Sequence, residues 1–322
     1  MPCPVTTDVA RAAAVLRAGG LVALPTETVY GLGANALDPR AVARIFAAKR
    51  RPAFDPLIVH VATLDDWSRV ASAMPPQALA LARRFWPGPL TLVLPKLAAI
   101  PDIVTSGLPT VGVRVPDHAL MRAVLERAGC PVAAPSANRF GRLSPTRAAH
   151  VVEQLGDDID LVLDGGPCAV GVESTIVRPD ADGVTVLRLG GLPVEQIEAV
   201  AGPVRIAAHE SPTAPEAPGM LPQHYAPRTP ITLVATGAVP APPPDACWGL
   251  LALRADAASP AGGAWAAAEY LTDDGDLVTA ASRLFDALHR LDALGLERIV
   301  ALAFPDEGLG RAINDRLRRA AA

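Results

Sequence analysis

The chain of 322 residues is long enough for one large domain or two ordinary ones. Half of its residues are apolar and 19% are charged, which excludes a disordered chain, and the net charge of -4 provides no overall attraction to nucleic acid or to an anionic membrane. The charge is uneven: residues 1–205 hold 20 basic and 19 acidic side chains (net +1), whereas residues 206–322 hold 9 and 14 (net -5). The first part is therefore the better host for an anionic ligand.

Cysteine usage and hydropathy indicate a cytoplasmic protein without a membrane segment. No two of the four cysteines form a CxxC pair, so a zinc site or a redox dithiol has little support. No basic N-terminal segment precedes an apolar stretch, and no apolar run reaches the roughly 18 residues of a membrane span. We therefore expect a reduced, cytoplasmic chain with no membrane partner.

The first part of the chain alternates helix-like and strand-like segments. Asp38 followed by Pro39 is a strong helix start, because proline fits the first helical position, and Gly31 and Gly33 predict a tight turn before it. The expected helices span residues 9–16, 39–49, 76–85, 117–127 and 146–155. The expected strands span residues 20–24, 57–61, 90–94, 110–115, 132–134, 161–163, 174–177 and 184–187. Since the last strands follow each other without helices and finish the domain, we predict an α/β fold with a mixed sheet.

Prolines then mark a linker. Six of them fall between residues 206 and 230, and that density prevents helix and interior strand. We therefore predict a domain at 1–205, a linker at 206–230 and a smaller α/β domain at 231–322. In the smaller domain the expected elements are strands at 231–234, 249–253 and 298–303 and helices at 277–291 and 309–317. No catalytic cluster is evident within it.

Two nucleotide-binding motifs were considered and are not favoured. Residues 31–36, GLGANA, match the dinucleotide fingerprint G-x-G-x-x-A, but the helix begins later, at Asp38, instead of directly after the glycines. A Walker A loop is excluded, because it requires Gly-Lys-Ser/Thr, whereas Lys49 follows alanine and Lys96 follows proline. A nucleotide bound here would have its phosphates held by side chains and ordinary backbone amides.

Basic residues at the end of the helix 39–49 are a candidate anion site. Lys49 is one of only two lysines in the chain, beside 27 arginines, and a compact ammonium suits a phosphate differently from a planar guanidinium. The alternative is that Lys49 and Arg51 are the basic end of a helix, which is favourable against the helix dipole. Spacing alone leaves both interpretations open.

Polar residues beyond the strand 132–134 form a second candidate. Ser136 and Asn138 follow that strand, and hydroxyl and amide groups at such a position suit phosphate and ribose. The alternative is a loop and a helix N-cap, which we favour for Ser144 taken alone. Arg114 and Arg188 lie in apolar strands, where a buried guanidinium needs an anion from the protein or from a ligand. A lone histidine at a strand end, such as His60, is more often structural than catalytic.

Taken together, these motifs resemble the YrdC-like family of L-threonylcarbamoyladenylate synthases, in its long two-domain form. They occur in the family's order and cover most of residues 20–227. The matching segments are PTETVYGLGANA at 25–36, Lys49-x-Arg51 with PLIVH at 56–60, PTVGVRVP at 109–116, PSAN at 135–138, SPT at 144–146, ESTIV at 173–177, LRLG at 187–190 and HYAP at 224–227.

The resemblance implies a fold and a reaction. The fold would be a YrdC-like twisted mixed sheet with helices around a deep basic cavity, with a small Rossmann-like α/β domain and a linker that covers the cavity. The reaction would make threonylcarbamoyl-AMP from L-threonine, bicarbonate and ATP with magnesium, releasing pyrophosphate. It is the first step of tRNA threonylcarbamoyladenosine modification, so a downstream tRNA threonylcarbamoyl transferase would be a partner, and weak tRNA binding is possible.

The resemblance also assigns site residues. Threonine and its carbamate would contact Thr26, His60, Arg114 and Ser174, and Lys49 and Arg51 would be catalytic through charge stabilisation. ATP would contact Lys49, Arg51, Asp55, Thr110, Ser136, Asn138, Ser144, Arg188 and Tyr225. The chain departs from the family at Asp55, where asparagine is common, and in lacking a basic residue before HYAP. No protein ligand for a metal is assigned.

Two rival functions stay open at this point. One is a non-catalytic RNA-binding protein, suggested by arginine-rich stretches at 40–51 and 139–147 but opposed by few aromatic residues for base stacking. The other is a different carbamoyl-adenylate transferase on the same fold. Under the synthase interpretation, Lys49→Ala and Arg51→Ala should each lose most turnover and keep their fold.

Overall fold

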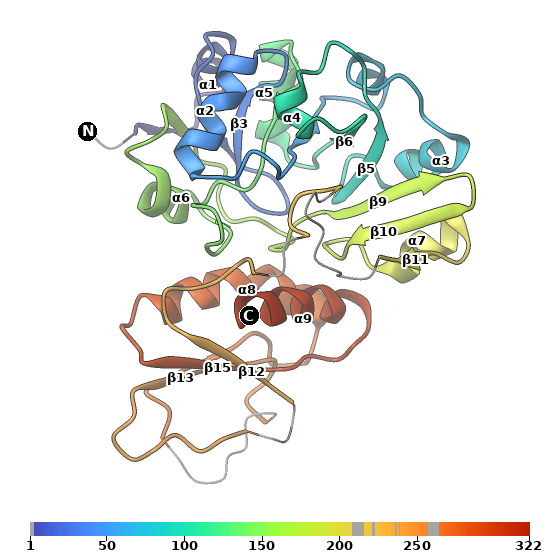
Figure 1. Ribbon diagram of the computed structural model, residues 1–322. Coiled ribbons are helices and arrows are strands. Elements are labelled where there is room, and N and C mark those ends of the chain that lie inside the picture. The colour runs from blue at the N-terminus through green and yellow to red at the C-terminus, as the bar shows by residue number, and fades with distance from the viewer. Residues whose placement is uncertain (1–2, 208–215, 221–222, 236, 238, 257–263) are drawn as a thin grey trace.

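The computed structural model describes residues 3–207, 216–220, 223–235, 237, 239–256 and 264–322. Three of the linker prolines, Pro212, Pro215 and Pro222, lie outside these residues. Figure 1 shows a large domain built on one sheet, and a smaller domain whose helices face the larger one. In the part of the chain that the structure describes, no helix is both long and apolar enough to cross a membrane.

The large domain contains an 11-stranded mixed sheet, which confirms the predicted fold class. β4 pairs with β6 in parallel, whereas β6 with β5 and β9 with β10 are antiparallel. In spatial order the strands are β1 (Val5–Thr6), β8 (Leu161–Leu163), β2 (Val22–Leu24), β3 (Gly31–Asn35), β7 (Val132–Ala133), β4 (Ile58–His60), β6 (Thr110–Arg114), β5 (Leu90–Pro95), β9 (Thr175–Asp180), β10 (Gly183–Arg188) and β11 (Arg205–Ile206).

The helices of this domain begin where the sequence provides caps. The Asp38 carboxylate accepts a hydrogen bond from the Arg40 amide at 2.9 Å, and Pro39 occupies the first turn, as predicted. The same helix ends at Arg50, whose left-handed φ of 53° turns the chain back toward the sheet. The helices are α1 (Val9–Arg17), α2 (Pro39–Lys49), η1 (Asp65–Arg69, a 3-10 helix), α3 (Pro76–Phe85), α4 (Asp102–Thr105), α5 (Ala119–Ala128), α6 (Ala148–Leu155) and α7 (Val194–Ala201).

Two expectations for this domain are wrong. Gly31 and Gly33 form no turn but lie in β3, in the middle of the sheet. Glycine is needed there for close approach, because a Cβ at Gly33 would lie 2.6 Å from Leu24 Cδ1 and 3.0 Å from Val132 Cγ1. The strand at 184–187 also does not finish the domain, since α7 and then β11 follow β10, and β11 pairs with β10 in parallel.

The smaller domain is a four-stranded parallel sheet with its two helices on the side of the large domain (Figure 1). β14 was missed by the sequence analysis, because its side chains alternate between half-buried and exposed and lack a strong apolar pattern. In spatial order the strands are β12 (Ile231–Val234), β15 (Arg298–Leu302), β13 (Trp248–Ala252) and β14 (Ala267–Tyr270), and the helices are α8 (Leu277–Asp292) and α9 (Gly308–Ala320).

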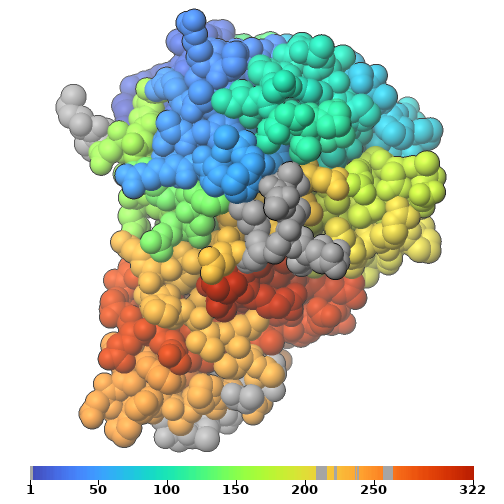
Figure 2. Space-filling model, viewed as in Figure 1, coloured from blue at the N-terminus to red at the C-terminus, as the bar shows by residue number. Residues whose placement is uncertain are grey.

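One apolar cluster spans the junction between the two domains, and Figure 2 shows the domains in contact along it. Val29, Leu143 and Val172 of the large domain belong to the same buried cluster as the apolar faces of α8 and α9. Gly171 packs so closely that a Cβ there would lie 2.4 Å from Ser282 Cα. The junction therefore fixes the segments around residues 29 and 172 against the smaller domain. The predicted domain limits of 1–205, 206–230 and 231–322 stay a prediction.

Candidate functional site

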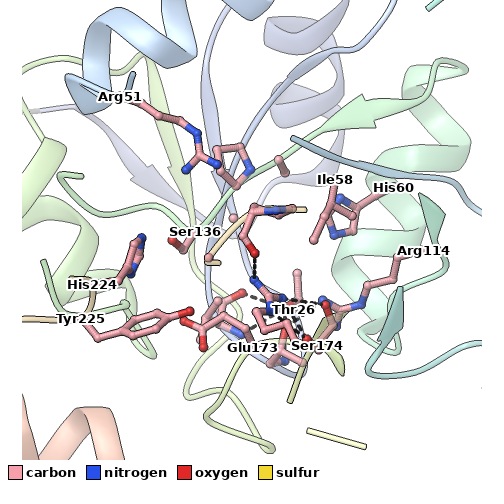
Figure 3. Close-up of a pocket in the computed structure, with 18 residues that line it drawn as sticks. Thr26, Arg51, Ile58, His60, Arg114, Ser136, Glu173, Ser174, His224 and Tyr225 are labelled. Atoms are coloured by element: carbon pink, nitrogen blue, oxygen red, sulfur yellow. Dashed lines mark hydrogen bonds between the residues drawn. The ribbon is translucent and has the colours of Figure 1, made fainter. Parts of the chain in front are cut away.

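A cavity of about 50 Å³ lies at the ends of the central strands and under the linker. In Figure 3, Arg51 and Arg114 approach it from opposite sides, and His224 and Tyr225 come from the linker. Polar side chains from segments far apart in the sequence therefore converge on one space. The lining residues are Thr26, Thr28, Val29, Gly31, Arg51, Ile58, His60, Arg114, Ala134, Pro135, Ser136, Glu173, Ser174, Arg188, Pro218, Gly219, His224 and Tyr225.

Lys49 supports one wall of this cavity from the end of α2. Its Nζ donates to the carbonyl oxygens of Ser136 and Asn138, each at 2.5 Å, and the side chain is buried. Burial lowers the pKa of Lys49 well below its ordinary value, and the neighbouring Arg51 lowers it further. The lysine thus anchors the polar loop after β7 and adds a cation that forms no ion pair within the described residues.

Arg51 and Asp55 form a buried pair beside Lys49. Arg51 Nη2 lies 2.9 Å from Asp55 Oδ2, but its hydrogen bonds go to the carbonyls of Asp55 (3.0 Å) and Pro56 (2.9 Å). Both carboxylate oxygens of Asp55 are without a hydrogen-bond partner in the described part of the chain. Complete burial raises the pKa of Asp55, although Arg51 and Lys49 act in the opposite direction. The Asp55 carboxylate therefore offsets the charge of Arg51, and its oxygens can still accept hydrogen bonds.

Arg188, at the end of β10, is a buried guanidinium that has no carboxylate partner among the described residues. Its donors reach the Ser174 carbonyl at 2.8 and 3.2 Å, the Ser174 hydroxyl at 3.1 Å and the Pro218 carbonyl at 3.1 Å. Burial lowers the pKa of Arg188 to about 10. Since a buried cation needs an anion, the site presents a charge that a ligand can neutralise.

Arg114, on β6, differs because the protein supplies its anion. Arg114 Nη2 lies 2.7 Å from Glu27 Oε1, and Nη1 donates to the Thr28 hydroxyl at 2.9 Å. The Thr28 hydroxyl lies 2.8 Å from that of Thr26, which donates to the Val29 carbonyl. These contacts order a row of hydroxyl groups along one side of the cavity.

His60 lies beside Arg114, its register partner in the β4–β6 pair. Burial and then the charge of Arg114 lower the pKa of His60 to about 3, so the ring is neutral at physiological pH. Its Nδ1 has no hydrogen-bond partner in the described part of the chain. His60 lines the cavity, where a neutral ring can accept a hydrogen bond from a ligand.

Glu173 joins the cavity to the smaller domain. Its Oε1 accepts a hydrogen bond from the Ser144 hydroxyl at 2.5 Å, and its Oε2 accepts one from Arg316 Nε at 2.7 Å. Arg316 lies on α9 and is completely buried. The smaller domain therefore contributes a charged side chain next to the site, which the sequence analysis did not expect.

The linker closes the cavity through two aromatic residues. The Tyr225 ring packs 5.7 Å from that of Phe285 on α8, and guanidinium groups of Arg316 and Arg319 lie 4.9 and 5.2 Å from its centroid. His224 stacks edge-on against Tyr225 at 4.2 Å. Tyr225 has a φ of 65°, a conformation that a non-glycine residue adopts only when surrounding contacts hold it. The smaller domain thus fixes the linker over the site.

The structure brings the residues predicted from the sequence close together. Lys49, Asn138, Ser144 and Asp55 are buried behind the lining and contact it or its loops. Thr110 lies apart, in an adjoining cavity that shares Pro218 with the first. Their roles toward particular ligands stay predictions. The predicted residues that line the main cavity are Thr26, Arg51, His60, Arg114, Ser136, Ser174, Arg188 and Tyr225.

Other residues of the site were missed. Glu27, Thr28 and Glu173 lie within motifs that the sequence analysis quoted, yet nothing in their spacing assigns them partners. Arg316 had a usable signal, since it lies on the buried face of an amphipathic helix in the sequence DRLRR. A charged residue on an apolar face indicates an ion pair or a site.

Among the described residues, no three His, Cys, Asp or Glu side chains are grouped as metal ligands. Three carboxylates near the cavity each form an ion pair with an arginine: Glu27 with Arg114, Asp55 with Arg51 and Glu173 with Arg316. The protein therefore offers cations and hydroxyl groups in this region, a set of groups that suits an anionic ligand.

Comparison with known proteins gives matches over the whole chain. A family model described as "Telomere recombination" matches residues 14–190, and one described as "Threonylcarbamoyl-AMP synthase, C-terminal domain" matches residues 192–322. The threonylcarbamoyl-AMP synthase of Pyrococcus abyssi is 44% identical over 96% of this chain and 92% of its own length. That of Bacillus subtilis is 42% identical over 98% and 93%. The crystal structure of P. abyssi Sua5 complexed with L-threonine superposes with a TM-score of 0.89 at 39% identity, covering 100% of this chain and 98% of that one.

Proposed function

This chain belongs to the threonylcarbamoyl-AMP synthase family, and from that premise we propose that its cavity joins L-threonine, bicarbonate and the AMP part of ATP, with release of pyrophosphate. It is an enzyme of the nucleotidyltransferase type. These relatives do not favour the RNA-binding protein or the different carbamoyl-adenylate transferase.

The unpaired charge of Arg188 is the observation that carries the proposal. Arg51, Arg114 and Arg316 each have a carboxylate within 2.9 Å, whereas Arg188 has none among the described residues and lines the cavity. Lys49 likewise donates only to carbonyls. Neither side chain forms an ion pair among the described residues, although Glu173 attracts the charge of Arg188 from a greater distance, and the phosphates of ATP would complete their neutralisation.

The arrangement supports a division of the cavity between the two substrates. Lys49, Arg51 and Arg188 would hold the phosphates, with Ser136, Asn138 and Ser144 around the nucleotide. Thr110 lines a small adjoining cavity of about 10 Å³, on the side where the base of ATP would lie. On the other side, the hydroxyl groups of Thr26 and Ser174 would select a hydroxylated amino acid. The P. abyssi relative has been solved with L-threonine.

Arg114 would orient the carboxylate of threonine. Its charge is shared with Glu27 at 2.7 Å, so the substrate carboxylate would use the remaining face of the guanidinium. Neutral His60 would accept a hydrogen bond from the amine, or from the carbamate that forms on it, without adding charge.

In the proposed reaction the neutral amine of threonine adds to the carbon of bicarbonate and water leaves, which gives the carbamate anion. A carbamate oxygen then attacks the α-phosphorus, the bond from that phosphorus to the bridging oxygen breaks, and pyrophosphate leaves with the electron pair. Both partners are anionic, so positioning and charge neutralisation by Lys49, Arg51 and Arg188 would dominate catalysis. No protein nucleophile is needed.

The linker would protect the product. Tyr225 and His224 cover the cavity, and an adenylate hydrolyses readily when water reaches it. Magnesium would enter with ATP, as part of the substrate. In that role it would neutralise the leaving pyrophosphate.

We also propose the cellular context. The product would pass to a tRNA threonylcarbamoyl transferase in the cytoplasm, and any contact with tRNA would be weak, because the chain has a net charge of -4.

Pyrophosphate release tests the proposal. The purified chain is incubated with ATP and magnesium, and L-threonine and bicarbonate are each omitted in turn. Release that requires both supports the synthase. Release that ignores threonine would point to another adenylating chemistry, and no release from folded protein would refute the proposal.

A further inference from the structure

Arg316 is the residue through which the smaller domain reaches the cavity. Its guanidinium is buried and makes three polar contacts, to Glu173 Oε2 at 2.7 Å, to Asp315 Oδ2 at 2.5 Å and to the Leu189 carbonyl at 2.9 Å. It also lies 4.9 Å above the Tyr225 ring. One side chain of α9 thus touches a carboxylate of the cavity wall and the aromatic residue of the linker.

Glu173 is an unusual residue to line an anion-binding site, because its own side chain is an anion. It lines the cavity beside Ser174 (Figure 3), and a bare carboxylate there would repel phosphate. Burial alone would raise the pKa of Glu173, but Arg316 and then Arg188 reverse the direction and lower it. The charge of Glu173 is therefore held ionised and offset, and its second oxygen is free to fix the Ser144 hydroxyl.

We propose that Arg316 is a positioning residue for ATP binding, an inference that rests on the proposed function. It neutralises Glu173, so that the carboxylate orients Ser144 without repelling phosphate, and it supports Tyr225 over the cavity. The smaller domain then completes the nucleotide site as well as anchoring the linker.

A purely structural link between the domains is the alternative, and the chain contains a matched example of one. Arg311, also on α9, forms an ion pair with Glu195 of α7 at 3.2 Å. That pair joins the same two domains but is partly exposed and lies outside the cavity lining. Arg311→Met is therefore the control for Arg316→Met.

The test measures Mg-ATP binding by titration calorimetry in wild type, Arg316→Met, Arg311→Met and the double variant Glu173→Gln with Arg316→Met. We expect Arg316→Met to weaken ATP binding by tenfold or more and Arg311→Met to leave it unchanged. The double variant should regain most of the affinity, because the uncompensated carboxylate is gone. In Arg316→Met alone, ATP affinity should improve as the pH falls from 8 to 6, since the freed Glu173 takes up a proton.

Unchanged ATP binding in folded Arg316→Met would overturn the inference, as would a folded double variant that binds as weakly as the single one. If Arg316→Met does not fold, the double variant decides alone: affinity within threefold of wild type supports the inference, and a tenfold loss refutes it. A wild-type chain that binds ATP but releases no pyrophosphate overturns the proposed function, while the binding series still decides the role of Arg316. A wild-type chain that does not bind ATP overturns both.

Discussion

Replacing Arg188 with methionine should separate activity from stability. Arg188 is buried, lines the cavity and has no carboxylate partner among the described residues. If the charge of Arg188 binds a ligand, then burying that charge destabilises the ligand-free protein. We expect Arg188→Met to lose most activity and keep its fold.

The size of the stability change follows from two opposing contributions. Burial is the main cause that lowers the pKa of Arg188 from 12.5 to about 10, which corresponds to a net cost of about 3.5 kcal/mol for keeping the side chain charged, at about 1.4 kcal/mol per pH unit. The hydrogen bonds to Ser174 O, Ser174 Oγ and Pro218 O return about 1 kcal/mol each. Since the two nearly cancel, the free energy of unfolding should change by less than about 1.5 kcal/mol.

Activity should respond differently. Losing a donor aimed at developing negative charge lowers kcat by roughly 100- to 1,000-fold. The assay pairs pyrophosphate release with urea unfolding, and Arg205→Met, an exposed arginine of β11 paired with Asp180, is the control. Turnover near wild type in Arg188→Met would refute the reasoning, and so would a loss of stability above about 3 kcal/mol.

Three further predictions concern the same regions. Arg51→Met should lower the free energy of unfolding by about 3 to 5 kcal/mol, because it leaves buried Asp55 without its cation. This differs from the expectation that Arg51→Ala keeps its fold. Adding Asp55→Asn should restore most of the stability in urea unfolding, and no restoration would contradict the pairing. Burial, with a smaller contribution from stacked His289, lowers the pKa of His150 to about 4, from about 6.5 in the unfolded chain. The stability that neutral His150 allows is therefore fully present above pH 6.5, and the free energy of unfolding falls by up to about 3 kcal/mol as the pH drops to 4. His150→Phe should flatten unfolding midpoints between pH 7.5 and 4.5, and an unchanged slope would assign the loss to other groups. Chelating magnesium with EDTA should stop pyrophosphate release but leave the melting temperature of the ligand-free chain unchanged, and a lower melting temperature would indicate a resident metal.

Local signals made much of the fold predictable. Asp38 and Pro39 specify the start of α2 through groups only two residues apart, and the apolar stripe of α8 needs nothing beyond its own periodicity. The prediction failed where a residue is determined by a contact with residues far away in the sequence. Gly33 resembles a turn residue, yet it is glycine because Leu24 and Val132 leave no room for a Cβ.

The charged residues of the candidate site were also hard to predict from the sequence, because their partners are distant in the chain. Arg114 and Arg188 both lie in apolar strands, and the sequence can say only that each needs an anion. The anion of Arg114 is Glu27, 87 positions earlier in the chain, whereas Arg188 forms no ion pair among the described residues. Burial can be estimated from an apolar pattern, but pairing depends on which strands meet. The protein itself offsets the charge of Arg114, whereas a bound substrate would offset that of Arg188.

Arg316 extends this argument to the smaller domain. Its partner Glu173 lies 143 positions away and belongs to a quoted motif, whereas the charged residue on the apolar face of α9 indicated an ion pair without identifying its partner. A buried ion pair is weak evidence for stability, because desolvation offsets most of the attraction between the charges. Here one partner also lines the cavity and the other supports Tyr225, so the pair constrains the shape of the site. The small domain is therefore better understood as part of the nucleotide site than as a separate module.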